Sequence, residues 1–405
     1  MRVIRLHTTL LAGCLTILAS ASVGAQTAEP VAATARLHIG PLALDPAIAV
    51  RNLGIDTNAL NASDDPDGDF TATITPELRE WLRLGRLALS GTSSVDWNYF
   101  QKLTSQRSFN GGQEGRADLA LGYVGPYALG AVARTRQRPN LEIDARVERT
   151  MTAVGGGLVV HAGTNLSVDI SQEHRTIDFG RTEFGDVTLA ESLNRSERET
   201  RLAARYALTP LTTLLVSAAH RRDRFVHAIV RDTDTVVGMA GLEFKPLALL
   251  AGRASVGWRR FTPKGPALPA FRGVVSDVEV TYQIRDVTRL SVAIARDVEY
   301  SFELLEPYYV STNTRVTVVQ ALGAAWDLVG RAGHTLLDYR QVLEVTGLAP
   351  GSRVDEILVV GGGFGRRLAS DVRIGIDLDH AARRSSAGDR DYDGMRVGGS
   401  VTYGF

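Results

Sequence analysis

The chain has 405 residues, and its 45 lysines and arginines are balanced by 45 aspartates and glutamates, so its formal net charge is zero. This balance does not favour a nucleic-acid partner, because such proteins carry a surplus of basic residues. The single cysteine, Cys14, lies in an apolar N-terminal run, so the rest of the chain can form neither disulfides nor thiolate metal sites. After residue 25 there is no apolar stretch of about 18 residues, which excludes a membrane-spanning helix.

Residues 1–25 have the three parts of a signal peptide: a basic start with Arg2 and Arg5, an apolar run, and small residues before a cleavage site. We predict cleavage between Ala25 and Gln26, which removes two basic residues and leaves a net charge of −2. The alternative is a lipoprotein signal ending at Cys14. Because the apolar run continues past Cys14, the site after Ala25 is favoured.

The rest of the chain consists of short runs in which apolar and polar residues alternate, the pattern of a strand with one apolar and one polar face. Between residues 371 and 380, for example, Val372, Ile374, Ile376 and Leu378 alternate with polar residues or glycine. Eighteen such runs are predicted, at 47–55, 69–82, 86–99, 114–124, 127–136, 147–161, 164–175, 196–208, 211–225, 232–244, 248–261, 272–284, 288–302, 309–326, 331–345, 353–367, 370–383 and 391–405.

The connections between these runs alternate in length. Tight turns such as Gly125-Pro126, Ala162-Gly163 and Arg285-Asp286 follow the even-numbered runs, and longer polar segments such as 56–68, 100–113, 176–195, 262–271 and 383–391 follow the odd ones. Short periplasmic turns and longer extracellular loops are typical of an outer-membrane barrel, whose closure pairs every backbone group. We therefore predict an all-β fold, a transmembrane antiparallel up-and-down β-barrel of 16 to 18 strands. A β-propeller or β-helix is disfavoured, because no fixed repeat is visible.

Three segments follow from this organisation: a signal peptide (1–25), a periplasmic N-terminal segment (26–46) and the outer-membrane barrel (47–405). The final strand carries apolar residues at every second position, Val397, Val401, Tyr403 and Phe405 among them. A terminal aromatic residue after such a pattern looks like the assembly signal that the barrel-assembly machinery recognises. We expect that machinery to be a partner.

Several short motifs resemble the putative β-barrel porin 2 family. They are Gly54-Ile55-Asp56-Thr57-Asn58, Ile74-Thr75-Pro76-Glu77-Leu78, Leu208-Thr209-Pro210-Leu211-Thr212 and Tyr403-Gly404-Phe405. The resemblance extends over nearly the whole mature chain and implies an outer-membrane porin-type barrel. Some members of the family are thought to serve polysaccharide export, so the resemblance says more about fold than about cargo.

The polar faces of the strands predict which charges line the lumen, since a barrel of this size is wide enough for an aqueous channel. Basic positions on one strand face acidic positions on the next two. This arrangement suits either a transverse field across a pore or ion pairs that stiffen the wall. The predicted lumen charges are Arg201, Arg205, Arg253, Arg259, Asp277, Glu279, Asp297, Glu299, Asp371, Arg373 and Asp377.

The longest predicted loop, 176–195, is the candidate for folding inward to set a constriction. Its charged residues are Asp178, Arg181, Glu183, Asp186, Glu191 and Arg195. No cofactor or metal is expected: two aspartate-rich loops, 65–69 and 389–394, lack the last ligand of a calcium loop. Nor is an enzyme expected, because the pairs Ser217–His220 and Asp379–His380 have no visible third member.

The sequence thus predicts an outer-membrane porin-like channel for passive passage of small polar solutes. Two alternatives stay open: a barrel component of exopolysaccharide export, working with export proteins, and a structural or adhesive barrel with a blocked lumen. Outer-membrane lipid and lipopolysaccharide are expected partners, because 42 of the 45 basic residues are arginines and guanidinium groups suit phosphates.

Overall fold

The computed structural model describes residues 32, 35–245, 249–342, 353–369, 371–387 and 389–404. The predicted signal peptide, with its cleavage site between Ala25 and Gln26, and the terminal Phe405 lie outside the described residues.

Eighteen long antiparallel strands make up the wall. Their bounds are β2 (Leu42–Asp56), β3 (Asp69–Leu84), β4 (Leu87–Phe100), β5 (Ser108–Leu119), β6 (Val124–Gln137), β7 (Val147–Ala162), β8 (Leu166–Phe179), β11 (Arg195–Thr209), β12 (Thr212–Phe225), β13 (Thr233–Phe244), β14 (Leu250–Pro263), β15 (Phe271–Ile284), β16 (Thr288–Tyr300), β17 (Tyr308–Leu322), β18 (Trp326–Arg340), β19 (Val354–Ala369), β20 (Val372–Ser385) and β21 (Tyr392–Tyr403).

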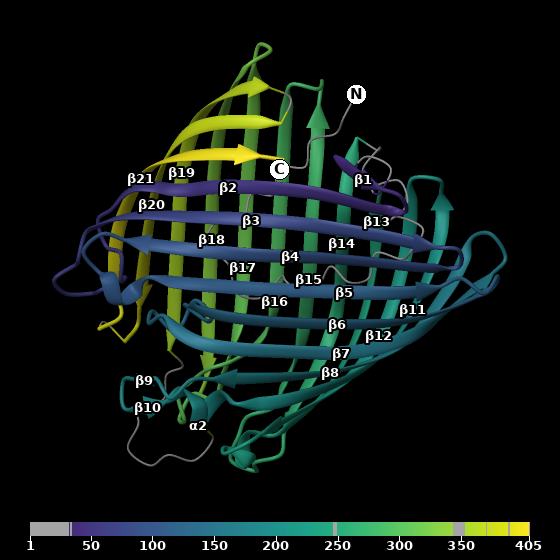
Figure 1. The fold of residues 1–405 in the computed structure, drawn as a ribbon. Coiled ribbons are helices and arrows are strands. Elements are labelled where there is room, and N and C mark those ends of the chain that lie inside the picture. The colour runs from purple at the N-terminus through teal and green to yellow at the C-terminus, as the bar shows by residue number, and fades with distance from the viewer. Residues whose placement is uncertain are drawn as a thin grey trace.

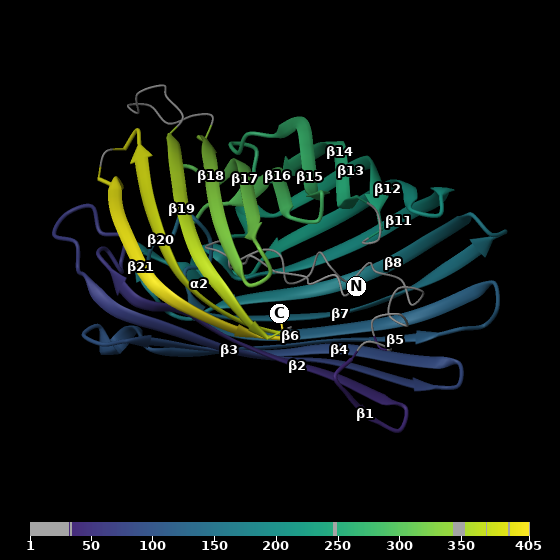
Figure 2. The same cartoon turned by 90° about the horizontal axis from the view of Figure 1, so that it is seen from above.

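Each strand pairs with its neighbours in chain order, β8 pairs with β11, and β2 pairs with β21 to close the ring. The strands β2–β8 cross in front of β13–β18 at a steep angle (Figure 1), and the turned view shows these two groups on opposite sides of the barrel (Figure 2). Such a crossing is the consequence of strand tilt in a closed barrel. The short strand β1 (Leu37–Ile39) pairs with the start of β2.

The predicted fold class and all eighteen strands are confirmed, and turns and loops alternate as expected. Several boundaries differ. Strand β2 begins at Leu42, so the end of the predicted segment 26–46 belongs to the wall. The turn predicted at Gly125-Pro126 is wrong, since both residues lie in β6 and the chain turns at Gly122, which has a φ of 76°. Proline is tolerated near the start of a strand, and so it does not by itself mark a turn.

The turn predicted between residues 326 and 331 is also misplaced. The chain turns at Gly323, with a φ of 70°, and β18 already begins at Trp326. Glycine adopts positive φ at little cost, so Gly323 can form the turn. The apolar residues on both sides of it look like one continuous strand in the sequence, which is why the turn was predicted too late. Strand β5 begins at Ser108 rather than at residue 114, because its first turn-like residues pair with β4.

The seam between β2 and β21 is the point at which the ring closes. Strand β2 has a bulge there, with Asn52 at a φ of 53°. Just beyond it, a Cβ atom on Gly54 would lie 2.0 Å from the backbone oxygen of Val397. The two strands therefore approach closely enough that this position accepts glycine and no side chain.

The loops at one end of the barrel contain the remaining elements. The connection from β8 to β11 holds the hairpin of β9 (Glu183–Phe184) and β10 (Val187–Thr188), followed by the helix α2 (Leu189–Leu193). Short 3₁₀ turns follow β4, η1 (Thr104–Gln106), and β12, η2 (Ile229–Arg231). Within the described part of the chain, no helix is long and apolar enough to cross a membrane.

Candidate functional site: the wall and mouth of the barrel

The two faces of the wall differ in chemistry and in exposure. On β14, Val256 and Trp258 are exposed, whereas the alternate residues Ser255 and Arg259 are buried. The wall is one layer thick, so a side chain can be buried only on the side that the ring encloses. The face that carries Ser255 and Arg259 therefore points into the lumen. The exposed apolar face is the one that meets lipid in a membrane barrel.

Charged residues on the inner face form ion pairs that run around the wall. Arg253 on β14 lies 2.7 Å from Asp277 on β15, and Arg259 reaches past β15 to Asp297 on β16 at 2.9 Å. Basic positions thus meet acidic ones on the next two strands. The Arg253–Asp277 pair is accessible to water, because its side chains are 29% and 47% exposed.

Most of the other predicted lumen charges also have partners on the inner face. Asp371 does not fit, because it lies in the turn before β20, 3.7 Å from Arg36. Glu279 is opposite Arg253 in the strand register. The remaining contacts are Arg201–Glu199 (2.9 Å), Arg205–Glu243 (3.6 Å), Glu299 with the hydroxyl of Tyr309 (2.9 Å), Arg373–Asp327 (2.6 Å) and Asp377–Arg331 (3.0 Å).

The end of the β16–β17 hairpin separates from β15 and bends into the lumen, while β17 stays paired with β18 up to Tyr308. Pairing between β15 and β16 stops at Ser276 and Arg296, whereas pairing between β16 and β17 continues to Tyr300 and Tyr308. Beyond this point both faces of the hairpin are buried. Val298, Tyr308 and Val310 pack against Phe261, Phe271 and Val275, while Tyr309 packs against Leu337, Tyr339 and Ile357. The hairpin end is therefore enclosed by the ring.

The tip of this hairpin, residues 301–307, is held by Glu142 from the loop between β6 and β7. The Glu142 carboxylate accepts hydrogen bonds from the Ser301 hydroxyl (2.6 Å) and from the backbone N–H of Phe302 (3.2 Å). Glu142 is fully buried. Burial raises the pKa of this carboxyl group to about 7, and the hydrogen bond from Ser301 opposes part of that rise.

Arginines from three other loops hold the same tip. Arg231, which is 2% exposed, donates to the backbone oxygens of Ser192 (3.0 Å) and Pro307 (2.6 Å). Burial lowers its pKa to about 10. Arg390 pairs with Glu303 at 2.8 Å, and Arg353 lies 3.7 Å from Glu306. The tip is thus a point where the loops meet.

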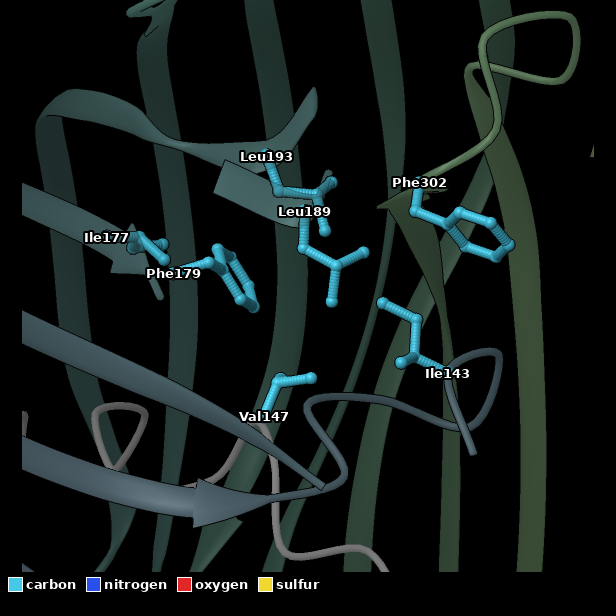
Figure 3. Close-up of a cluster of buried hydrophobic side chains, with 7 residues drawn as sticks. All are labelled: Ile143, Val147, Ile177, Phe179, Leu189, Leu193 and Phe302. Carbon is cyan, nitrogen blue, oxygen red and sulfur yellow. The ribbon is translucent and has the colours of Figure 1, made fainter. Parts of the chain in front are cut away.

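The loop between β8 and β11 packs on the tip through its apolar side. Leu189, Leu193 and Phe302 belong to one buried cluster with Ile143, Val147, Ile177 and Phe179. Figure 3 shows the seven side chains, which come from four separate segments. The predicted inward-folding loop is therefore part of the mouth, by which we mean the loop end of the barrel. It packs there against the 301–307 tip.

None of the six charged residues predicted for that loop belongs to this buried cluster. Arg181, Glu183, Asp186 and Glu191 are exposed to solvent. Asp178 and Arg195 belong to β8 and β11, because these strands extend past the predicted loop bounds of 176 and 195. Polar strand ends that project beyond the membrane resemble a loop in sequence, which explains the difference.

A fully buried ion pair lies behind the tip. Arg383 on β20 and Asp355 on β19 have no exposed side-chain surface, and Arg383 donates to Asp355 and to Asp144 at 3.0 Å. Arg353 also pairs with Asp355. These contacts join two strands of the wall to the loop between β6 and β7.

The loops leave a pocket of about 520 Å³ at the mouth, between the connections that follow β2, β4, β6, β8 and β20. Asp144, Arg146, Asp389 and Arg390 supply its charges. Arg146 stacks on the ring of Phe100, and burial together with neighbouring arginines lowers its pKa to about 10. A polar solute entering here meets both signs of charge.

Sequence reasoning missed the residues that build the mouth: Glu142, Asp144, Arg146, Arg231, Arg353, Asp355, Arg383 and Arg390. A signal was present in the apolar residues that interrupt polar loops, such as Ile143 and Phe302. A solvated loop has no reason to carry them, so they indicate a packed loop.

In each of the two residue pairs considered for catalysis, Ser217–His220 and Asp379–His380, the two members lie on opposite faces of the wall. Ser217 is on the inner face with the buried Ala219, and His220 is on the outer face; Asp379 pairs with Arg331, whereas His380 contacts Asp393 on the outside. Asp69 accepts backbone N–H groups of Lys102 and Leu103. No cluster of three or more possible metal ligands occurs in the described residues.

Residues 30–405 match the family model described as putative beta-barrel porin 2. The chain belongs to this family. As a closed barrel of the porin 2 family, the protein is porin-like and belongs to the outer membrane. Its predicted assembly residues Val397, Val401 and Tyr403 lie on the exposed face of β21, and their role stays a prediction.

Solved structures with a similar fold are outer-membrane proteins. The protein opdK from Pseudomonas aeruginosa is 10% identical, with 89% of this chain and 98% of that chain covered and a TM-score of 0.49. A BenF-like porin from Pseudomonas fluorescens Pf-5 is 11% identical over 89% and 98%, with a TM-score of 0.48. OpdQ of Pseudomonas aeruginosa is 11% identical over 89% and 96%, with a TM-score of 0.45. No curated protein matches the sequence.

Proposed function

We propose that this porin 2 family member is a channel for passive passage of small polar solutes across the outer membrane. An 18-stranded ring is wide enough for an aqueous lumen. The observation that carries the proposal is the water-accessible charge on its inner face, above all the Arg253–Asp277 pair. Charged groups in contact with water line a hydrated path, whereas a solid barrel would bury or replace them.

The loops at the mouth set the width of this path in our proposal. The 301–307 tip narrows the ring, and solutes pass beside it through the pocket lined by Asp144, Arg146 and Arg390. The mature chain would begin at Gln26 and would be inserted by the barrel-assembly machinery through its last strand.

The test is a planar-bilayer recording of the purified, refolded protein, combined with swelling of liposomes in sugars of increasing size. We expect stepwise conductance and faster swelling with the smaller sugars. Replacing Glu303, Leu304 and Leu305 by Gly-Ser-Gly should raise the conductance. The control is the same replacement of Pro266, Ala267 and Leu268, in a loop at the same end, where Leu268 donates its backbone N–H to Gly265 of the same loop. Absence of conductance from all three proteins would contradict a channel and favour export or a blocked lumen.

A further inference from the structure

The outer face of the wall carries two pairs of arginines near the loop end of the strands. Arg198 on β11 is directly opposite Arg222 on β12, and Arg260 on β14 is directly opposite Arg272 on β15. All four side chains are exposed. They share their face with exposed apolar residues such as Leu202 and Val256, so they point away from the lumen.

Like charges directly opposite one another on neighbouring strands destabilise a sheet. None of the four arginines forms a hydrogen bond or an ion pair with another described residue. The nearest acid on this face, Asp234, lies opposite Arg222 in the strand register, but it is bound by Arg224 at 2.8 Å and also faces Lys264 at 3.8 Å. Asp234 thus faces three cations, Arg222, Arg224 and Lys264, so this part of the outer face keeps a net positive charge.

The depth of these arginines identifies what could neutralise them. On β11 the outward residues between Arg198 and the turn are apolar from Leu202 to Leu208. At roughly 3.3 Å per residue and a tilt of about 45°, Arg198 lies about 23 Å from Leu208 along the membrane normal, close to the height of the apolar band. Trp258, exposed beside Arg260, fits the aromatic girdle at this level. The arginines thus lie at the depth of lipid headgroups.

We propose that these paired arginines bind the phosphate groups of an anionic glycolipid in the outer leaflet. Around the first pair, Gln172, Thr200 and His220 complete a pocket of about 200 Å³. The two pairs are about 16 Å apart, because they are separated by three strand spacings across the wall and by two residues along the strands. This distance suits one headgroup with two phosphates or two neighbouring headgroups. Because the exposed Leu202 and Val216 lie farther down the same face, below Thr200 and His220, the ligand needs acyl chains as well as phosphate.

The test uses purified full-length protein in a phosphate-free neutral detergent, with bisphosphorylated lipid A as the probe and the same lipid without phosphates as its counterpart. We expect native mass spectrometry to show binding of the phosphorylated lipid alone. Arg198→Gln/Arg222→Gln and Arg260→Gln/Arg272→Gln should each weaken binding about tenfold, since each removes two charge-assisted contacts. In lipid-free detergent both variants should be at least as heat-stable as the wild type, because a repulsion is removed.

The matched control is Arg86→Gln/Lys245→Gln, which removes two exposed cations from the turns at the other end and should leave lipid binding unchanged. Millimolar inorganic phosphate should not displace the lipid. Equal binding of both lipids, wild-type binding by the two arginine variants, or binding of inorganic phosphate as tight as that of lipid A would each overturn the proposal. The last of these outcomes would make the patch a site for free anions.

Discussion

The middle of the wall and the mouth use the same kinds of charged residue in different ways. In the wall, Arg253 and Asp277 pair while 29% and 47% of their side-chain surfaces stay exposed. In the mouth, Arg383 and Asp355 pair with no exposed surface at all. An exposed pair contributes about 0–1 kcal/mol, whereas removing one partner of a buried pair costs roughly 3–5 kcal/mol. Burial therefore decides whether an ion pair mainly stabilises the fold or mainly acts on the ions and solutes in the water next to it.

The largest effect should come from the seam, where the wall tolerates no side chain. Gly54→Val places atoms against the backbone of Val397 and should prevent ring closure, so that little folded barrel accumulates. The measurement is the heat-dependent gel mobility of membrane fractions. Gly238→Val is the control, since open space surrounds that glycine and the barrel should form. A normal amount of folded Gly54→Val protein would show that the seam is looser than described.

Breaking the buried pair in the mouth should have the next largest effect. Arg383→Gln leaves the Asp355 carboxylate with less compensation and should lower the free energy of unfolding by roughly 3–5 kcal/mol. Chemical denaturation in detergent or lipid would report it. Arg383→Gln combined with Asp355→Asn should recover part of the loss. A midpoint equal to that of the wild type would mean that water reaches this pair.

Glu142 should make the mouth sensitive to pH. Its pKa is about 7 with the tip in place, against 4.5 when it is free, so closure binds a proton. The contribution to closure is complete below pH 4.5 and is lost as pH rises through 7, up to about 3 kcal/mol. Conductance should therefore be higher at pH 8 than at pH 5. Glu142→Gln should flatten this dependence, and the exposed Glu191→Gln should leave it intact; identical profiles for all three proteins would contradict the prediction.

Within the wall, the two arginines should differ in a smaller way. Arg259 is 9% exposed, so the loss of its ion pair with Asp297 should lower the free energy of unfolding by more than the roughly 1 kcal/mol that is the upper end for exposed pairs. Arg253→Gln should cost about 0–1 kcal/mol because its pair is in water. Unfolding midpoints of the two single variants give the comparison. Equally large losses from both variants would indicate that the Arg253 pair is shielded from water and stabilises the wall as the Arg259 pair does.

The wall was predictable because strand alternation fixes which face a residue occupies. Arg253, Arg259, Asp277 and Asp297 could be assigned to the lumen from their spacing alone, and the order of strands gave their partners. Turns were less secure, since Gly122 and Gly125 offer the same signal and the pairing register decides between them.

The mouth could not be predicted, because its contacts join residues far apart in sequence. Glu142 and Ser301 are separated by 159 positions, and no periodicity links them. Loop charges such as Glu183 and Glu191 look like constriction residues, but the apolar side of their loop decides how it packs. The outer arginine pairs also depend on the register, since alternation alone does not reveal that Arg198 is opposite Arg222.

A single planar-bilayer experiment on two variants tests the division between wall and mouth most directly. The variant with Glu303, Leu304 and Leu305 replaced by Gly-Ser-Gly should raise conductance and leave the reversal potential in a salt gradient unchanged. Arg253→Gln/Arg259→Gln should leave conductance nearly unchanged and shift the reversal potential toward cations, most clearly at about 0.01 M salt, where screening extends to roughly 30 Å. A shift of reversal potential from the tip variant with none from the arginine variant would contradict the account.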